Sequence, residues 1–341
     1  MPALIIGLDL AKHVFQIHGT GQNGEVVLRK KLRRSEMIEF FRQLPSSLVG
    51  VEACGTSHHW RRVLTDLGHE VRLMPASYVK PYIKRGKNDE VDAEAICEAV
   101  TRPTMRFVEV KSVEQQSGLM LHRTRELLVK QRTMLVNALR GQLAEFGLVA
   151  PKGTWSIPAL HDLARGSSEA VLPDEVRGCV ELIMGQIDDL QLRIGVLEKA
   201  ILANHRVSEV SQRLQTIPGI GIITASAISA TIADARAFRS GRHFAAWIGL
   251  VPRQSGTGGK VYLGRISKKG NPYLRKLLVL GATAVIRYSR NKPGLADWIN
   301  ALLARRPARV VTVAVANKLA RIAWAVMRRG ERFKQALSAV A

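Results

Sequence analysis

The sequence has little of what a secreted, zinc-binding or membrane-spanning protein needs. Its 341 residues include only three cysteines, Cys54, Cys97 and Cys179, an odd number without the spacing of metal ligands. Neither a disulfide framework nor a zinc site is therefore expected. No uninterrupted apolar run approaches the roughly 20 residues that span a bilayer, and the first residues lack a basic, cleavable signal. We expect a soluble cytoplasmic protein that is not bound to a membrane.

Acidic residues are also scarce. The chain has 28 Asp and Glu against 51 Lys and Arg, a net charge of +23, and its 46% hydrophobic content excludes wholesale disorder. Residues 236–341 hold 22 Lys and Arg but only two acids. Such a segment favours nucleic acid, because each neutralised phosphate releases counterions. The alternative, a membrane surface, would require one basic amphipathic helix, whereas these cations are spread over several segments.

The first hundred residues predict an α/β domain. Short β-branched runs separated by turn residues are typical of strands, and capped or amphipathic runs are typical of helices. Strands are expected at 3–9, 14–18, 26–32, 48–52 and 69–74. Helices are expected at 35–44 with Ser35 as N-cap, at 56–67 and at 89–100.

The rest of the chain predicts mainly helices. Leucines at helical spacing indicate two long amphipathic helices, at 113–146 and about 176–204, on either side of a Pro/Gly/Ser-rich interval at 151–173. They predict an antiparallel hairpin, either a coiled-coil arm used for dimerisation or an ordinary helical pair. Further helices are expected at 224–233, 240–248, 272–288 and 308–327, with a loop at 251–271.

Four acids stand out in the α/β segment. Asp9 and Glu52 end predicted strands that would be neighbours in a twisted sheet, and Asp89 and Asp92 share one face of a helix. Four converging carboxylates repel one another unless divalent cations neutralise them, and Mg²⁺ prefers oxygen ligands. Any single one of these acids could instead be a turn or helix N-terminal residue. The set of four favours a magnesium site that acts on phosphodiesters.

Two basic-segment motifs suggest phosphate contact. Pro218, Gly219 and Gly221 lie between apolar helices, as in a helix-hairpin-helix, although a plain helix–helix turn has the same residues. Farther on, Ser255 and Thr257 lie in a glycine-rich stretch. This stretch could bind phosphate passively or supply a nucleophile. The residues alone favour passive binding. The stretch does not match the Walker phosphate loop. The accompanying candidate cations are Arg253, Lys260, Arg265, Lys268 and Lys269.

Taken in order, these motifs resemble those of the transposases of the insertion-sequence 110 and 1111 group. The resemblance covers nearly the whole chain. The motifs are GLDLAK at 7–12, VEACG at 51–55, KNDEVDA at 87–93, IPGIG at 217–221, and GLVPRQ through GRISKKG over 249–270. It implies a ribonuclease-H-like (RuvC-like) metal-binding domain at 1–110, a coiled-coil arm at 111–206, and a mainly α, basic domain at 207–341 that contains the helix-hairpin-helix and a serine loop.

The resemblance also implies a mechanism. Asp9, Glu52, Asp89 and Asp92 would be the DEDD acids that bind Mg²⁺, and the C-terminal domain would bring a serine into the metal site of a partner subunit. That serine would attack donor and target DNA through covalent intermediates, in a dimer or tetramer guided by a bridge RNA. The family's usual serine position falls on Gly256 here. Ser255 is therefore the predicted nucleophile, with Thr257 as the alternative.

Three other functions are compatible with parts of the sequence. A RuvC-like nuclease of the junction-resolvase type would use the metal site for hydrolysis without a covalent intermediate. A non-enzymatic nucleic-acid binder would use only the basic third. An actin-like ATPase also begins with a Gly-Leu-Asp strand followed by hairpins, but the later Asp-Gly phosphate loop is missing, and the positive charge would have no role.

Overall fold

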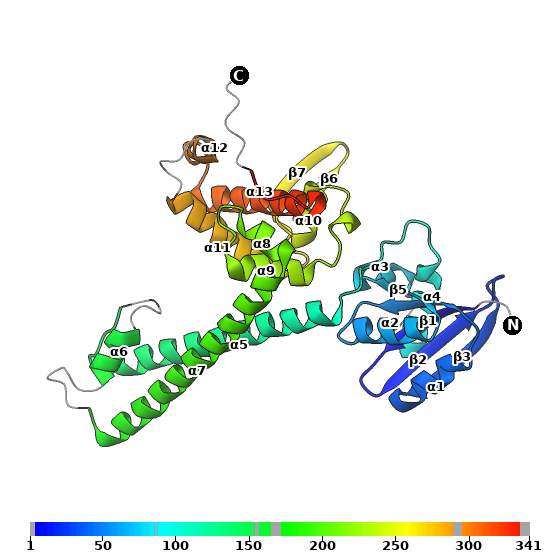
Figure 1. The fold of residues 1–341 in the computed structure, drawn as a ribbon, viewed down its shortest axis with the longest axis horizontal. Helices are drawn as coiled ribbons and strands as arrows, with labels where there is room; N and C mark the ends of the chain where they lie inside the picture. Colours follow the sequence, from blue (N-terminus) through cyan, green and yellow to red (C-terminus); the bar gives the residue numbers. More distant parts are fainter. Residues whose placement is uncertain are drawn as a thin grey trace. The chain divides into compact units, whose positions relative to one another are not determined.

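The computed structural model describes residues 4–84, 86, 88–151, 153, 157–164, 172–288 and 295–334. The chain divides into two compact units, Met1–Ser112 and Val113–Ala341. We call them the sheet unit and the helical unit, and describe each by itself (Figure 1).

The sheet unit is built on a mixed five-stranded sheet of order β3-β2-β1-β4-β5. The first three strands pair antiparallel, whereas β1, β4 and β5 run parallel. All five strands lie within a residue or two of their predicted positions, and the sheet is the ribonuclease-H-like one that was expected. The strands are β1 (Ile5–Leu10), β2 (Val14–Thr20), β3 (Val26–Arg33), β4 (Leu48–Glu52) and β5 (Glu70–Met74).

Helices lie against the sheet through two apolar clusters. In one cluster, Ile6 and Leu8 of β1 are buried with Phe41 of α1 (Met37–Arg42) and Leu64 of α2 (Ser57–Asp66). In the other, Met74 of β5 packs with buried residues of α4 (Asp89–Val100). Because successive residues of a strand point to opposite faces, the residue between Ile6 and Leu8 faces α4. That residue is Gly7, and the site depends on it.

Short helical turns complete the sheet unit, and one of them corrects a prediction. Ser35 is not an N-cap: it lies inside the 3-10 turn η1 (Arg34–Glu36), and α1 begins only at Met37. The Arg33 N–H donates to the Glu36 carboxylate at 2.7 Å, which satisfies a backbone donor at the helix entrance in place of a serine hydroxyl. The remaining turns are α3 (Ala76–Val79) and η2 (Lys80–Tyr82).

The helical unit begins with two long helices, α5 (Val113–Ala144) and α7 (Asp174–Val207), close to their predicted bounds. They run antiparallel, since Arg125 pairs with Glu198 at 2.6 Å and Arg132 donates to Gln191. Between them, the predicted Pro/Gly/Ser-rich interval contains a helix that was not predicted, α6 (Ile157–Ala164). Residues 165–171 of that interval lie outside the described residues.

The C-terminal helices share one core, in which Leu214, Phe244, Leu278 and Val315 are fully buried. The segment predicted as a loop over 251–271 forms, for the most part, a two-stranded antiparallel hairpin, so that prediction was wrong. The elements are α8 (Glu209–Gln215), α9 (Ile222–Thr231), η4 (Ala235–Ala237), α10 (Gly241–Ile248), β6 (Pro252–Thr257), β7 (Lys260–Ile266), α11 (Pro272–Tyr288), α12 (Leu295–Leu303) and α13 (Ala308–Arg329).

The helix α13 is long and apolar enough to cross a membrane by length and composition. Its apolar side chains have another role here, because Val311, Val315 and Leu319 are buried in the core of the helical unit. The central helix of a globular protein has the same composition as a membrane span, and α13 is such a helix.

Candidate functional site

The first acid of the site lies at the end of β1. Leu8 pairs with Val51 of the parallel strand β4, so the residues that follow them, Asp9 and Glu52, stand at the same end of two neighbouring strands. Both carboxyl groups are partly buried. This is the arrangement that the sequence predicted for these two residues.

The helix α4 brings in the other two acids, and two glycines let it do so. Gly7 of β1 and Gly50 of β4 are partners in the sheet. A Cβ on Gly7 would lie 2.0 Å from the Ala93 carbonyl oxygen, and one on Gly50 would lie 2.8 Å from the Val100 side chain. Only a hydrogen atom fits at these two positions. The backbone of α4 therefore contacts the backbone of β1 at Gly7, and the Val100 side chain of α4 contacts β4 at Gly50.

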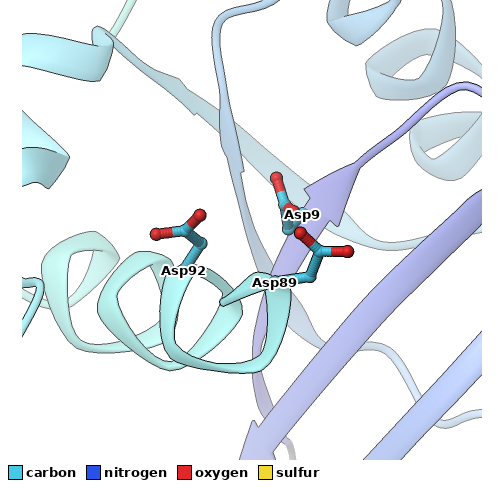
Figure 2. Close-up of side chains that lie close together, drawn as sticks. All are labelled: Asp9, Asp89 and Asp92. Atoms are coloured by element: carbon cyan, nitrogen blue, oxygen red, sulfur yellow. The ribbon is translucent and has the colours of Figure 1, made fainter. Parts of the chain in front are cut away.

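The start of α4 is fixed by Asn88, whose side-chain oxygen accepts a hydrogen bond from the Glu90 N–H at 3.2 Å. This cap holds the first turn, which carries Asp89 and Asp92. Figure 2 shows both side chains projecting from the helix toward Asp9. One carboxylate oxygen from each of these three residues lies within 4.8 Å of the other two.

Glu52 is not part of this close group of three, but it is electrostatically coupled to it. The charge of Glu52 contributes to the raised pKa of Asp9. The pKa of Glu52 is itself raised, mainly by burial and then by the charge of Asp92. The four predicted acids therefore form one neighbourhood, with three carboxylates in a cluster and the fourth beside it. Three oxygen donors within 4.8 Å suit a hard divalent cation such as Mg²⁺.

Asp9 has the most perturbed carboxyl group of the cluster. Burial, followed by the charges of Asp92, Asp89 and Glu52, raises its pKa from 3.8 to about 6. Crowding of like charges at a partly desolvated position is what a bound cation would relieve. Asp9 is thus the group whose charge would be neutralised most directly by a metal ion.

A consequence for stability follows from this raised pKa. In the metal-free protein, Asp9 favours folding when it is protonated, and this contribution is lost as the pH rises from about 4 to about 6. Asp9→Asn removes the penalty, so above pH 6 the variant should be more stable than the wild type by about 1 kcal/mol, because solvent screens a partly exposed carboxylate and only part of the pKa difference appears as stability. Thermal unfolding in EDTA between pH 4 and pH 7 measures the difference. Parallel curves for the two proteins would contradict the assignment.

The Pro-Gly motif forms a tight turn between α8 and α9. Ile220 N–H donates to the Ile217 carbonyl at 2.9 Å, and Gly219 has φ +84. A Cβ on Gly219 would meet Val285 at 2.5 Å and the Gly281 carbonyl oxygen at 2.8 Å, so this glycine allows the turn to pack against α11. Pro218 and Gly221 are exposed, and Gly221 is the N-cap of α9.

The hydroxyl-bearing segment is the hairpin of β6 and β7. Its two-residue turn consists of Gly258 and Gly259, with φ +57 and +79, the conformation that matches the twist of paired strands. Ser255 is paired with Tyr262, and Thr257 with Lys260. Directly opposed and alternate residues share a face, so the two candidate hydroxyls lie on the same face of the hairpin, while Gly256 belongs to the other.

The predicted phosphate-binding cations are all exposed. Arg253 belongs to β6, Lys260 and Arg265 belong to β7, and Lys268 and Lys269 follow the hairpin. Arg275 of α11 holds the end of this segment, because its guanidinium donates to the carbonyls of Ile248 at 2.7 Å and Lys269 at 2.8 Å. The hairpin therefore exposes cations and hydroxyl groups, and Arg275 of α11 fixes the segment that follows it.

Comparison with known proteins gives consistent matches along the chain. Residues 6–147 match the DEDD family of IS110, described as "Transposase", and residues 211–295 match the "Transposase IS116/IS110/IS902 family". A Pseudomonas aeruginosa protein named "Probable family 20 transposase" is 51% identical over 95% of this chain and 96% of its own length. The transposase for insertion sequence element IS1328 of Yersinia enterocolitica is 40% identical over 97% of this chain and 98% of its own length. The transposase for insertion sequence element IS1111A of Coxiella burnetii is 38% identical over 97% of this chain and 91% of its own length.

Proposed function

The chain belongs to the IS110 family of transposases, enzymes that act on DNA, and we propose that it excises and integrates an insertion sequence by Mg²⁺-dependent cleavage and exchange of strands. The observation that carries the proposal is the cluster of Asp9, Asp89 and Asp92 at the end of β1, with Glu52 beside it. In this proposal 1–110 is the metal-binding domain, 111–206 an arm for assembly, and 207–341 the serine-bearing domain.

The cluster fits the cation that the family implies. Its donors are carboxylate oxygens only, they lie close together, and the pKa of Asp9 is raised by burial and then by the charges of the neighbouring acids. Asp9, Asp89, Asp92 and Glu52 would hold Mg²⁺. When bound, the metal would stabilise charge on the attacking and leaving oxygens of a phosphodiester.

Ser255 is the proposed nucleophile. Its Oγ would form a bond to phosphorus while one P–O bond to the neighbouring sugar breaks, and the serine proton would leave with that sugar oxygen. The hydroxyl of a second strand would then attack the phosphoserine: its oxygen would bond to phosphorus while the P–Oγ bond breaks, and its proton would pass to the released serine, which exchanges the strands. The exposed position of Ser255 on the hairpin and the cations around it support this role.

Assembly and guidance are the remaining parts of the proposal. The exposed apolar side chains of α7, Leu182, Leu192 and Val196, support contact between copies of the chain through the long helices. The Pro218–Gly221 turn would contact the nucleic-acid backbone as a helix-hairpin-helix, and Gly221 leaves the open backbone that this requires. The surplus of cations in residues 236–341 supports binding of both DNA and a bridge RNA.

Metal binding provides a test that is independent of catalysis. A ligand at ten times its Kd stabilises the folded state by about 1.4 kcal/mol. Added Mg²⁺ or Mn²⁺ should therefore raise the Tm of the wild type, and EDTA should reverse the increase. Asp92→Asn should respond much less, because it removes one of the clustered donors.

The matched control is Glu90→Gln, which removes an exposed acid from the same helix turn but outside the cluster. It should respond to the metal as the wild type does. Equal metal responses from all three proteins would mean that the clustered acids do not hold the cation.

A further inference from the structure

A groove of about 560 Å³ lies between the first turn of α10 and the middle of α13 in the helical unit. The two helices meet closely, because a Cβ on Gly241 would lie 3.1 Å from the backbone of Arg321. Ile322, Trp324 and Ala325 supply the apolar part of its wall. The groove is therefore a surface hollow formed where two helices that are distant in the sequence pack closely together.

Three cations line this groove, namely Arg242 of α10 and Lys318 and Arg321 of α13. No acidic side chain is among the lining residues, and neither arginine forms an ion pair with an acid in the described part of the chain. Some other cations of this unit are paired with acids, as Lys276 is with Glu126 at 3.0 Å. The groove thus concentrates positive charge, and no acid in the described ranges is paired with its two arginines.

Lys318 is held in place by its surroundings. Its ammonium lies 4.2 Å from the centre of the Trp298 ring, a favourable cation–π distance. Burial, and then the charge of Arg321, lower its pKa. An anion in the groove would relieve this repulsion, since a negative charge within a few ångströms favours the protonated amine.

We propose that this groove binds the phosphodiester backbone of a nucleic acid through Arg242, Lys318 and Arg321. The inference rests on the proposed function and adds a second contact surface to it, apart from the hairpin and the Pro218–Gly221 turn. Phosphate oxygens match the three donors, and the apolar wall suits the sugar between two phosphates. The surrounding segment, with 22 basic and two acidic residues in 236–341, directs a polyanion to this unit.

Salt dependence of binding tests the assignment on the full-length chain. Each phosphate contact that is lost makes the plot of log K against log[salt] less steep by about 0.9 for duplex DNA, and by about 0.7 for a single strand. Lys318→Gln/Arg321→Gln should therefore flatten the slope by about 1 to 2. Lys318→Arg should restore the wild-type slope, because it keeps the charge, and this rescue would separate phosphate contact from a merely structural role.

Lys276→Gln is the control, since it makes the same charge change at a lysine that is already paired with Glu126. It should leave the slope close to that of the wild type. Fluorescence anisotropy with labelled duplex DNA and, separately, with labelled structured RNA identifies which nucleic acid occupies the groove. Thermal unfolding confirms that each variant is folded.

The outcomes are separable. A flattened slope with either nucleic acid supports the groove and names its ligand. A double variant whose slope equals those of the wild type and Lys276→Gln with both nucleic acids overturns the inference, while the proposed function stands. If the wild type binds neither DNA nor RNA, the proposed function itself fails along with it.

Discussion

Asp9→Asn is expected to reduce DNA strand cleavage by more than about 100-fold while leaving DNA binding intact. Even residues that only support a metal ligand cost about 10–100-fold when they are removed, and Asp9 is one of the three clustered acids. Asparagine preserves the shape of the side chain but removes the charge that would hold the cation. Cleavage of DNA that carries the element's ends, measured with and without Mg²⁺, gives the effect.

DNA binding should survive in this variant because the proposed phosphate-binding cations lie in the helical unit, whereas Asp9 belongs to the sheet unit. Glu90→Gln is the control for a loss of acidic charge nearby, and it should cleave as the wild type does. Full cleavage by Asp9→Asn would exclude the acid cluster as the catalytic centre. Loss of cleavage with binding retained would exclude a protein that only binds nucleic acid.

Ser255→Ala is expected to abolish the covalent protein–DNA adduct and to leave affinity for nucleic acid within a few-fold of the wild type. The change removes only the hydroxyl, and the pairing of β6 with β7 depends on backbone groups that alanine retains. Adducts that resist denaturant and disappear after protease treatment measure the reaction directly.

Thr257→Ala is the informative comparison, because Thr257 lies on the same face of the hairpin two residues away. It should still form adducts. If it loses them while Ser255→Ala keeps them, Thr257 is the nucleophile. Mg²⁺-dependent cleavage by the wild type without any adduct would instead favour the hydrolytic nuclease.

Much of the sheet unit could be predicted from the sequence because its elements depend on local patterns. The predicted strand at 48–52 and the helix at 89–100 coincide with β4 and α4, since a β-branched run and an Asn-capped acidic start are strong local signals. The prediction that Ser35 is an N-cap was wrong because it too depended on a local pattern. A serine before an apolar run is typical of an N-cap, but here Glu36 satisfies the backbone donor.

The hairpin of β6 and β7 was missed because both of its strands are exposed. Without a buried face there is no alternation of apolar and polar residues, and Gly256 and Lys260 have low strand propensity. One signal could have found it: Gly258 and Gly259 are the kind of pair that closes a two-residue hairpin. Helix α12 was not predicted either, although Leu295–Leu303 is largely apolar.

The candidate acids could be predicted because each one lies at or next to the end of a strand or in the first turn of a helix, positions that local sequence patterns indicate. The cationic groove could not be predicted, because Arg242 and Lys318 are far apart in the chain and only tertiary packing brings them together. The same holds for Gly7 and Gly50, whose role depends on a helix that begins about forty residues after the second glycine.

Those two glycines have a further consequence for how the site can change. At Gly7 the separation between Asp9 and the acids of α4 is set by contact of main chain with main chain, so no rotamer change can compensate there for a wider helix–strand distance. A single methyl group on Gly7 would move the helix away while every acid remained in the sequence. A homologue could thus retain all four acids and still have lost the geometry for a cation, and the residue at position 7 would reveal it.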